Sequence, residues 1–148
     1  MGVSFTAYIV VGVYRNQIIE PYTELRPVTR YNELTGEPYT SNIKINRYKL
    51  FGEPASDEVC NVYDERGLVG LLQHLGMDLN GEFEDEFVTD YSDDAVFVGK
   101  LLYAVGPGDS ETVSGEEIER VSYRLTEQLR QAGAKDLQAY ARLHMYAG

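Results

Sequence analysis

The stretch FTAYIVVGVY, from Phe5 to Tyr14, decides the fold that this sequence predicts. Its residues alternate with a period of two, and both alternating sets are rich in β-branched and aromatic side chains. This pattern is typical of a strand that is covered on one face and partly covered on the other. We therefore expect the stretch to be an interior strand of a sheet.

Two segments downstream of this strand predict a long hairpin. Residues 28–32 and 40–51 have strand patterns and flank a turn through residues 35–38, Thr-Gly-Glu-Pro. Neither face of the second strand is wholly apolar, so we expect the hairpin to lie at an edge of the sheet or to protrude from it. A brief run at residues 17–20 is expected to end at Pro21, after a turn at residues 15–16.

The second half of the chain carries three more strand patterns. Residues 95–105 form an almost continuous apolar run, which a Gly-Pro-Gly turn ends. Residues 137–146 alternate so regularly that we favour a strand over a helix there. Residues 86–91 are a further, shorter candidate.

The clearest helix is predicted over about residues 114–132. Ser114 and Glu117 form a capping box at its start, and Gly133 follows its end. Its apolar residues fall on one stripe, as an amphipathic helix requires: Ile118, Val121, Leu125, Leu129 and Ala132.

A short helix is predicted over about residues 66–75, where leucines recur at helical spacing and Gly76 marks the end. Residues 52–64 before it are expected to be a loop by composition. These elements predict a single α+β domain over residues 1–148, with an antiparallel or mixed sheet, one long C-terminal helix and one short helix. The strand, helix, strand order near the end predicts a crossover if those two strands lie parallel.

Composition limits the chemistry of the chain. Its 148 residues suffice for one domain with its own core, and a hydrophobic content of 43% argues against a disordered acidic chain. The single cysteine, Cys60, excludes an internal disulfide and any zinc site built on two cysteines. The apolar run at the N-terminus lacks the basic region and cleavage site of a leader and is too short to span a bilayer, so we expect it to be a strand. We therefore expect a protein of the cytoplasm, and no motif implies a cofactor.

The acidity of the chain is local. The formal net charge of −11 divides into −2 for residues 1–66, −8 for 67–99 and −1 for 100–148. The carboxylates crowd between Asp78 and Asp94, and this acidic segment is either a solvated face or a binding surface. As a binding surface it would engage a basic partner protein, because closely spaced charges steer association. The contact candidates are Glu82, Glu84, Asp85, Glu86, Asp90, Asp93 and Asp94.

The spacing of Asp78, Asn80 and Glu82 also invites a calcium-binding interpretation. An EF-hand loop needs glycine at its sixth position and glutamate at its twelfth, and here these positions are Phe83 and Thr89. We therefore expect no metal site. The excess of negative charge also argues against direct binding of nucleic acid or of anionic membranes.

A tyrosine-rich surface offers an alternative binding site. The chain has 12 tyrosines and no tryptophan, and alternation within residues 137–146 places Tyr140, Arg142 and His144 on one strand face. Tyr8 on the first strand is a further candidate. Flat rings beside an arginine can stack a base and hold a phosphate, so the alternative function is binding of a nucleotide or small anion. Tyrosine is also a common strand residue in its own right.

Enzymatic activity is the third interpretation. Cys60 and His74 form the candidate nucleophile and base, but one cysteine and two histidines pair by chance easily. No metal-ligand or phosphate-loop motif is present. We therefore expect a protein without catalytic residues, which acts by stoichiometric binding and whose oligomeric state the sequence does not set.

The hairpin residues VTRYNELTGEPY, from Val28 to Tyr39, resemble a segment of small uncharacterised proteins of tailed bacteriophages and prophages. Those proteins, too, open with a strand similar to Phe5–Tyr14. The resemblance covers about a third of the chain and carries over no functional residue. It implies a phage accessory protein inside a bacterial host cell, of a kind that often blocks host defences by stoichiometric binding.

Overall fold

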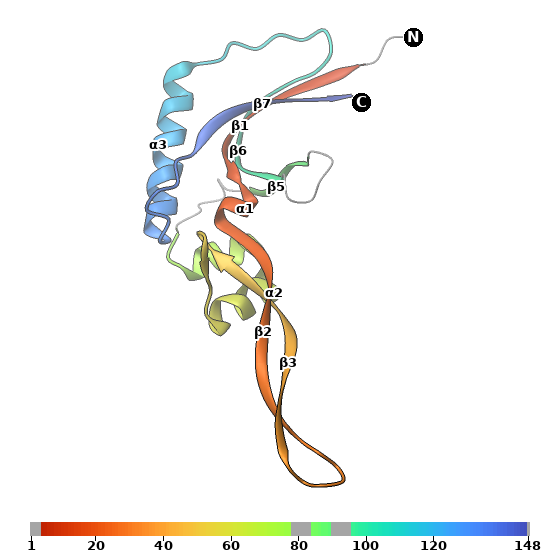
Figure 1. The fold of residues 1–148 in the computed structure, drawn as a ribbon. Helices are drawn as coiled ribbons and strands as arrows, with labels where there is room; N and C mark the ends of the chain where they lie inside the picture. The colour runs from red at the N-terminus through yellow and green to blue at the C-terminus, as the bar shows by residue number, and fades with distance from the viewer. Residues whose placement is uncertain (1–3, 78–83, 90–95, 148) are drawn as a thin grey trace.

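The computed structural model describes residues 4–77, 84–89 and 96–147, with residues 84–89, 146 and 147 described by backbone alone. The fold is α+β, as predicted, and combines two antiparallel sheets with helices (Figure 1). In chain order the elements are β1 (Phe5–Tyr14), α1 (Arg15–Ile18), β2 (Ile19–Tyr31), β3 (Pro38–Leu50), β4 (Glu53–Pro54), α2 (Asp57–His74), β5 (Glu84–Thr89), β6 (Val96–Val105), α3 (Gly115–Gln131) and β7 (Tyr140–Ala147).

The first strand, β1, is an interior strand of the larger sheet. That sheet has the order β5-β6-β1-β7, and β1 is antiparallel to both of its neighbours. The predicted interior position is therefore confirmed. The strands predicted at 95–105 and 137–146 are β6 and β7, and the candidate at 86–91 is β5, which begins two residues earlier. Since β6 and β7 both run opposite to β1, they are parallel to each other, as the predicted crossover requires.

The main core lies between this sheet and the helices. Val11 and Val13 of β1 and Val98 of β6 are fully buried on one face of the sheet, where they meet the apolar stripe of α3. The predicted long helix is confirmed, because the stripe packs into this core as expected of an amphipathic helix. Its core residues are Ile118, Val121, Leu125, Leu129 and Ala132.

The N-terminus of α3 is capped as predicted, with one additional partner. The Ser114 hydroxyl accepts a hydrogen bond from the Glu117 amide at 3.3 Å. The Tyr103 hydroxyl of β6 accepts from the Ser114 amide at 3.1 Å and donates to the Glu117 carboxylate at 2.8 Å. The capping box is thus closed through a tyrosine that also ties α3 to the sheet.

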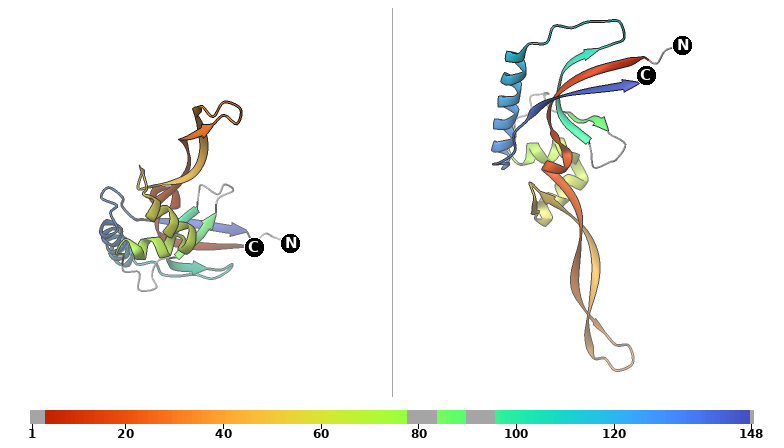
Figure 2. Two further views of the ribbon diagram at one scale, coloured as in Figure 1. Left: turned by 90° about the horizontal axis from the view of Figure 1, so that it is seen from below. Right: turned by 45° about the horizontal axis from the view of Figure 1, so that its top comes forward.

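The second sheet is mostly one long hairpin. Strands β2 and β3 have 13 residues each and pair along their whole length, and β4 adds two residues beside the base of β3. Figures 1 and 2 show this ribbon, residues 19–50, standing out from the body of the molecule, and we call it the hairpin arm. The prediction of a protruding hairpin is confirmed. Its tip leaves Leu34 almost wholly exposed.

The base of the arm differs from the prediction. Pro21 does not end a short strand, because both Pro21 and Pro27 lie inside β2. Strand β2 is at an edge of its sheet, where a proline can turn its missing amide toward solvent. The turn expected at residues 15–16 is instead the start of α1, a single helical turn between β1 and β2.

Helix α2 is where the prediction is most clearly wrong. Residues 52–64 are expected to be a loop, yet the Ser56 hydroxyl caps a helix there by accepting from the Val59 amide. The apolar residues of this first part, Val59, Val62 and Tyr63, recur at helical spacing and pack against the main core. Gly67, with a φ of 71°, interrupts the helix. The turns after it are the predicted short helix, which ends as expected at Gly76 (φ 97°).

A hydrogen bond fastens the base of the hairpin arm to α2. The Tyr48 hydroxyl donates to Asp64 at 2.7 Å, and the Tyr48 ring meets Tyr63 edge-on at 4.8 Å between centroids. The hydrogen bond to Asp64, followed by burial, raises the pKa of Tyr48 from its usual 10 to about 12. This contact is therefore sensitive to alkaline pH.

We expect the stabilising contribution of the Tyr48 contact to be lost as the pH rises. Because folding raises the pKa, the protonated hydroxyl stabilises the fold fully below pH 10, and this contribution is lost as the pH approaches about 12. Tyr48→Phe should remove that part of the alkaline loss in the free energy of unfolding, measured by urea denaturation across this range. Tyr123→Phe, at an exposed position of α3, is the control and should keep the wild-type slope. Equal slopes in the two variants contradict the expectation.

Candidate functional site

The face of the larger sheet opposite α3 carries a cluster of rings around Phe97. Phe97 is fully buried, and its ring centroid lies 5.3 Å from that of Tyr14, 5.4 Å from that of Tyr140 and 5.4 Å from that of His144. Three strands contribute to this cluster. We call its members the aromatic face: Tyr8, Tyr14, Phe97, Tyr140, Arg142 and His144.

The strand register brings together the four residues that the sequence singled out as a ligand site. The pairs between β1 and β7 are Tyr8 with His144, Val10 with Arg142 and Gly12 with Tyr140. Alternate residues of a strand share a face of the sheet. All four candidates therefore lie on one face, and the Phe97 cluster lies among them.

The ring cluster crosses the central strand, β1, near Gly12. Phe97 belongs to β6 and Tyr140 to β7, so their rings meet over β1, which lies between these strands. Gly12 is the residue of β1 that pairs with Tyr140, and the backbone of β6 lies so close to it that a Cβ atom there would overlap the Val98 carbonyl oxygen.

The larger sheet curls toward the aromatic face. The Phe97 ring contacts two residues that lie far apart along the strands. One is Tyr14, which pairs with Phe97. The other is His144, which pairs with Tyr8, six residues before Tyr14 on β1. Six residues of extended strand span about 20 Å, so one ring reaches both only where the strands bend. Figure 1 shows this curvature in β1. The aromatic face is therefore concave.

Part of the aromatic face is open to solvent. Tyr140 is 39% exposed and Arg142 is half-buried, whereas Phe97 and His144 are buried. Burial raises the pKa of Tyr140 above its usual value. The Arg142 guanidinium carbon lies 5.0 Å from the Tyr14 ring centroid, a cation–π contact that holds the charge in place. An accessible ring beside a positioned guanidinium can stack a planar ligand and pair with an anion.

Sequence reasoning missed the centre of this site. Phe97 lies in an apolar run between Val96 and Val98, where both neighbours are also buried and no alternation marks its face. Its place on the aromatic face follows from its pairing with Tyr14 and from its ring contacts. A run buried on both sides carries no such signal in the sequence.

The acidic segment lies partly outside the described residues. Those outside are Asp78, Asn80, Glu82, Asp90, Asp93 and Asp94. Glu84, Asp85 and Glu86 belong to β5, an edge strand of the larger sheet, and are described by backbone alone. Val88 of β5 pairs with Phe97, so the strand that carries these three acidic residues borders the strand at the centre of the aromatic face.

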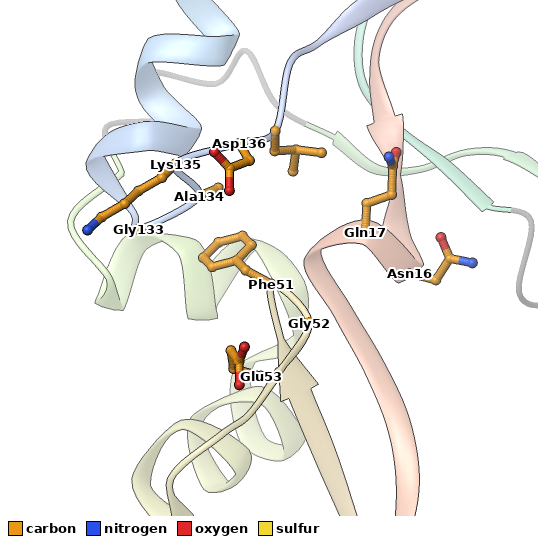
Figure 3. Close-up of a pocket in the computed structure, with 10 residues that line it drawn as sticks. Asn16, Gln17, Phe51, Gly52, Glu53, Gly133, Ala134, Lys135 and Asp136 are labelled. Atoms are coloured by element: carbon orange, nitrogen blue, oxygen red, sulfur yellow. The ribbon is translucent and has the colours of Figure 1, made fainter.

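Away from the aromatic face, a hollow with a volume of about 490 Å³ lies between α1, the turn after β3 and the segment after α3 (Figure 3). Phe51 lines it with a φ of 50°, unusual for a bulky residue, in a two-residue turn with Gly52. In Figure 3 Asp136 points toward the Phe51 ring, whereas Lys135 points away from it. The polar groups of this hollow do not converge on one point, as those of an active site do.

The candidate nucleophile and base have other partners. The Cys60 thiol is buried and lies 4.0 Å from the Ala55 carbonyl oxygen, and His74 lies 3.2 Å from the Glu58 carboxylate. Among the described residues, no three His, Cys, Asp or Glu side chains cluster as metal ligands do. No helix in the described part of the chain has the length and apolarity needed to cross a membrane.

Comparison with known proteins yields no relative. No family model matches the chain, and no curated protein or solved structure is significantly similar to it. The function is therefore inferred from the residues of this chain.

Proposed function

We propose that the protein is a non-enzymatic binding protein that takes up a planar anion of the nucleotide class on the aromatic face. One observation carries the proposal: three cross-strand pairs place Tyr8, Tyr140, Arg142 and His144 on one concave face around a shared ring. Stacking of a base on an aromatic side chain contributes about 1–3 kcal/mol and tolerates every base. Arg142 supplies the positive charge for a phosphate.

The net charge of the chain restricts the ligand. A protein with a net charge of −11 repels polyanions, and the positive charge held within the aromatic face is that of Arg142. A ligand with one phosphate meets less of this repulsion than a triphosphate or a nucleic acid strand. We therefore infer a nucleoside monophosphate or a cyclic nucleotide as the ligand class.

Tyr140→Ala should weaken binding of a nucleoside monophosphate by roughly tenfold or more, because the accessible stacking ring is lost. Tyr140→Phe keeps the ring and should retain most of the affinity. The measurement is isothermal titration with adenosine, guanosine, cytidine and uridine monophosphates. Tyr123→Ala removes a 71% exposed tyrosine from α3 and is the matched control. Equal affinity in the Tyr140→Ala and Tyr123→Ala proteins contradicts the proposal.

Arg142 tests the anion half of the proposal separately. Wild-type protein should prefer adenosine monophosphate over adenosine, and Arg142→Gln should reduce that preference while adenosine binding changes little. Arg120→Gln, on the exposed part of α3, makes the same change of charge and should keep the preference. An unchanged preference in Arg142→Gln rules out Arg142 as the phosphate contact.

The second candidate function is binding of a basic partner protein through the acidic segment. It is favoured by the position of β5, since an edge strand with Glu84, Asp85 and Glu86 is placed for contact with another protein. Such binding should weaken steeply with salt, whereas stacking should depend little on it. Replacing the three residues with Gln, Asn and Gln should weaken capture of a basic protein. Unchanged capture removes this candidate.

Both functions fit the resemblance of the hairpin to small proteins of tailed bacteriophages. In the first, the protein would sequester a nucleotide signal inside the host cell, and in the second it would mask a basic surface of a host protein. The neighbouring genes test whether the protein has such a counter-defence role in a phage. A place among counter-defence genes would favour it, and a place among genes of metabolism would oppose it.

A further inference from the structure

Among the edge strands of the two sheets, β7 is unlike the others. An edge strand offers unpaired backbone groups to other chains, and proteins usually guard such edges with proline or with charged residues. The other edge strands carry residues that oppose pairing with another chain: Pro21 and Pro27 in β2, Pro54 in β4, and Glu84, Asp85 and Glu86 in β5. Strand β7 has no proline, lysine or carboxylate, and its one charged residue is Arg142.

Strand β7 also exposes large apolar side chains. Leu143 is 61% exposed and Met145 is 62% exposed, and they pair with Ile9 and Ala7 of β1. They are on the face of the sheet that α3 covers farther along, opposite to the aromatic face. Figures 1 and 2 show β1 and β7 running on beyond α3, and Phe5 at this end of β1 is exposed as well.

Charge favours this strip for contact between two copies of the chain. Two molecules that each carry a net charge of −11 repel each other, and they approach most easily where carboxylates are missing. Residues 137–147 contain no aspartate or glutamate, whereas the opposite edge strand contains three acidic residues in a row. A strand paired antiparallel with its own copy is self-complementary, which a twofold dimer requires.

From these observations we propose that β7 is a self-association edge. Two copies pair their β7 strands antiparallel about a twofold axis, so that the larger sheets join into one continuous sheet. Leu143 and Met145 of each copy are covered in the contact. The contact uses the backbone edge of β7 and the face that bears Leu143, and it leaves the opposite, aromatic face accessible. It is therefore independent of the proposed ligand site.

Sedimentation equilibrium of the full chain over a series of concentrations and salt levels tests the proposal. The wild type should form a dimer, and its association should strengthen with sodium chloride, because salt screens the repulsion between two acidic chains. Leu143→Lys should raise the dissociation constant at least tenfold. Tyr123→Lys, at an exposed position of α3, makes the same change of charge and should leave the dimer intact.

The Leu143→Lys change lowers the net negative charge of the chain, so loss of the dimer in this variant does not come from greater repulsion between the net charges of the two copies. Its folding is checked by circular dichroism, and Met145→Lys gives a second variant at the same edge. Hydrogen exchange should show amides of β7 that become more protected with concentration, while those of β5 do not change. A wild type that stays monomeric at high salt overturns the proposal, as does a dimer that survives both lysine variants or leaves β7 exchange unchanged.

Discussion

Gly12→Ala should destabilise the fold by about 3 kcal/mol or more, since overpacking against backbone is among the most costly core changes. A Cβ atom on Gly12 would overlap the Val98 carbonyl oxygen and lie 2.9 Å from the Gly99 Cα atom. Both contacts are backbone atoms of the paired strand β6, so no side chain can move aside. For a chain of this length the expected fall in Tm is about 6–12 °C.

Gly115→Ala is the matched control for this substitution. Gly115 is the first residue of α3, and a Cβ atom there meets no heavy atom within 4 Å. Alanine in a helix should be neutral or slightly stabilising compared with glycine. The measurement is the Tm of both variants in thermal unfolding. A Gly12→Ala protein with the same Tm as Gly115→Ala would contradict the close packing of β1 against β6.

Phe97→Ala should cost about 3–5 kcal/mol of stability, the range for removal of a fully buried phenylalanine. The ring contacts Tyr14, Tyr140 and His144, and each of these would lose a packing partner and border a cavity. Because Phe97 lies beneath the proposed ligand site, the same change should also abolish nucleotide binding in whatever protein remains folded.

Phe97→Leu separates packing from ring contact. Leucine keeps most of the buried volume and should cost less than about 1.5 kcal/mol. Leucine provides no ring for Tyr140 to meet edge-on. The free energy of ligand binding should therefore weaken by more than the free energy of unfolding does. Urea denaturation of the two variants provides the measurement. A cost below about 1 kcal/mol for Phe97→Ala would show that the ring cluster is not a packed unit.

The features of the fold that follow local rules were predictable from the sequence. The alternation of β1 marked an interior strand, and the capping residues and apolar stripe of α3 defined its bounds to within one residue. The prediction misses the first part of α2, because residues 52–64 contain Pro54 and several polar residues, which are typical of a loop. Its apolar residues Val59, Val62 and Tyr63 recur at helical spacing and pack against the core, and the Tyr63 ring also meets the Tyr48 ring of the hairpin base. This spacing and the Ser56 cap are local signals of a helix, which the polar composition of the segment obscures.

The candidate site was predictable in its members but not in its shape. Alternation alone placed Tyr140, Arg142 and His144 on one face, since a strand has only two faces. The pairing of Tyr8 with His144, the place of Phe97 and the curl of the sheet depend on strand register and on a register shift after Ile9. Register is a property of two strands together, and the sequence of either strand does not specify it.

The most direct test of the proposed function is an NMR titration that follows the Tyr140 ring and the Arg142 side chain. Adenosine monophosphate is added to the full chain up to millimolar concentration, and the Tyr123 ring serves as the internal control. We predict that signals of Tyr140 and Arg142 shift together and saturate, while those of Tyr123 stay in place. Signals of Tyr140 and Arg142 that do not move with any of the four nucleoside monophosphates would contradict a nucleotide site on the aromatic face.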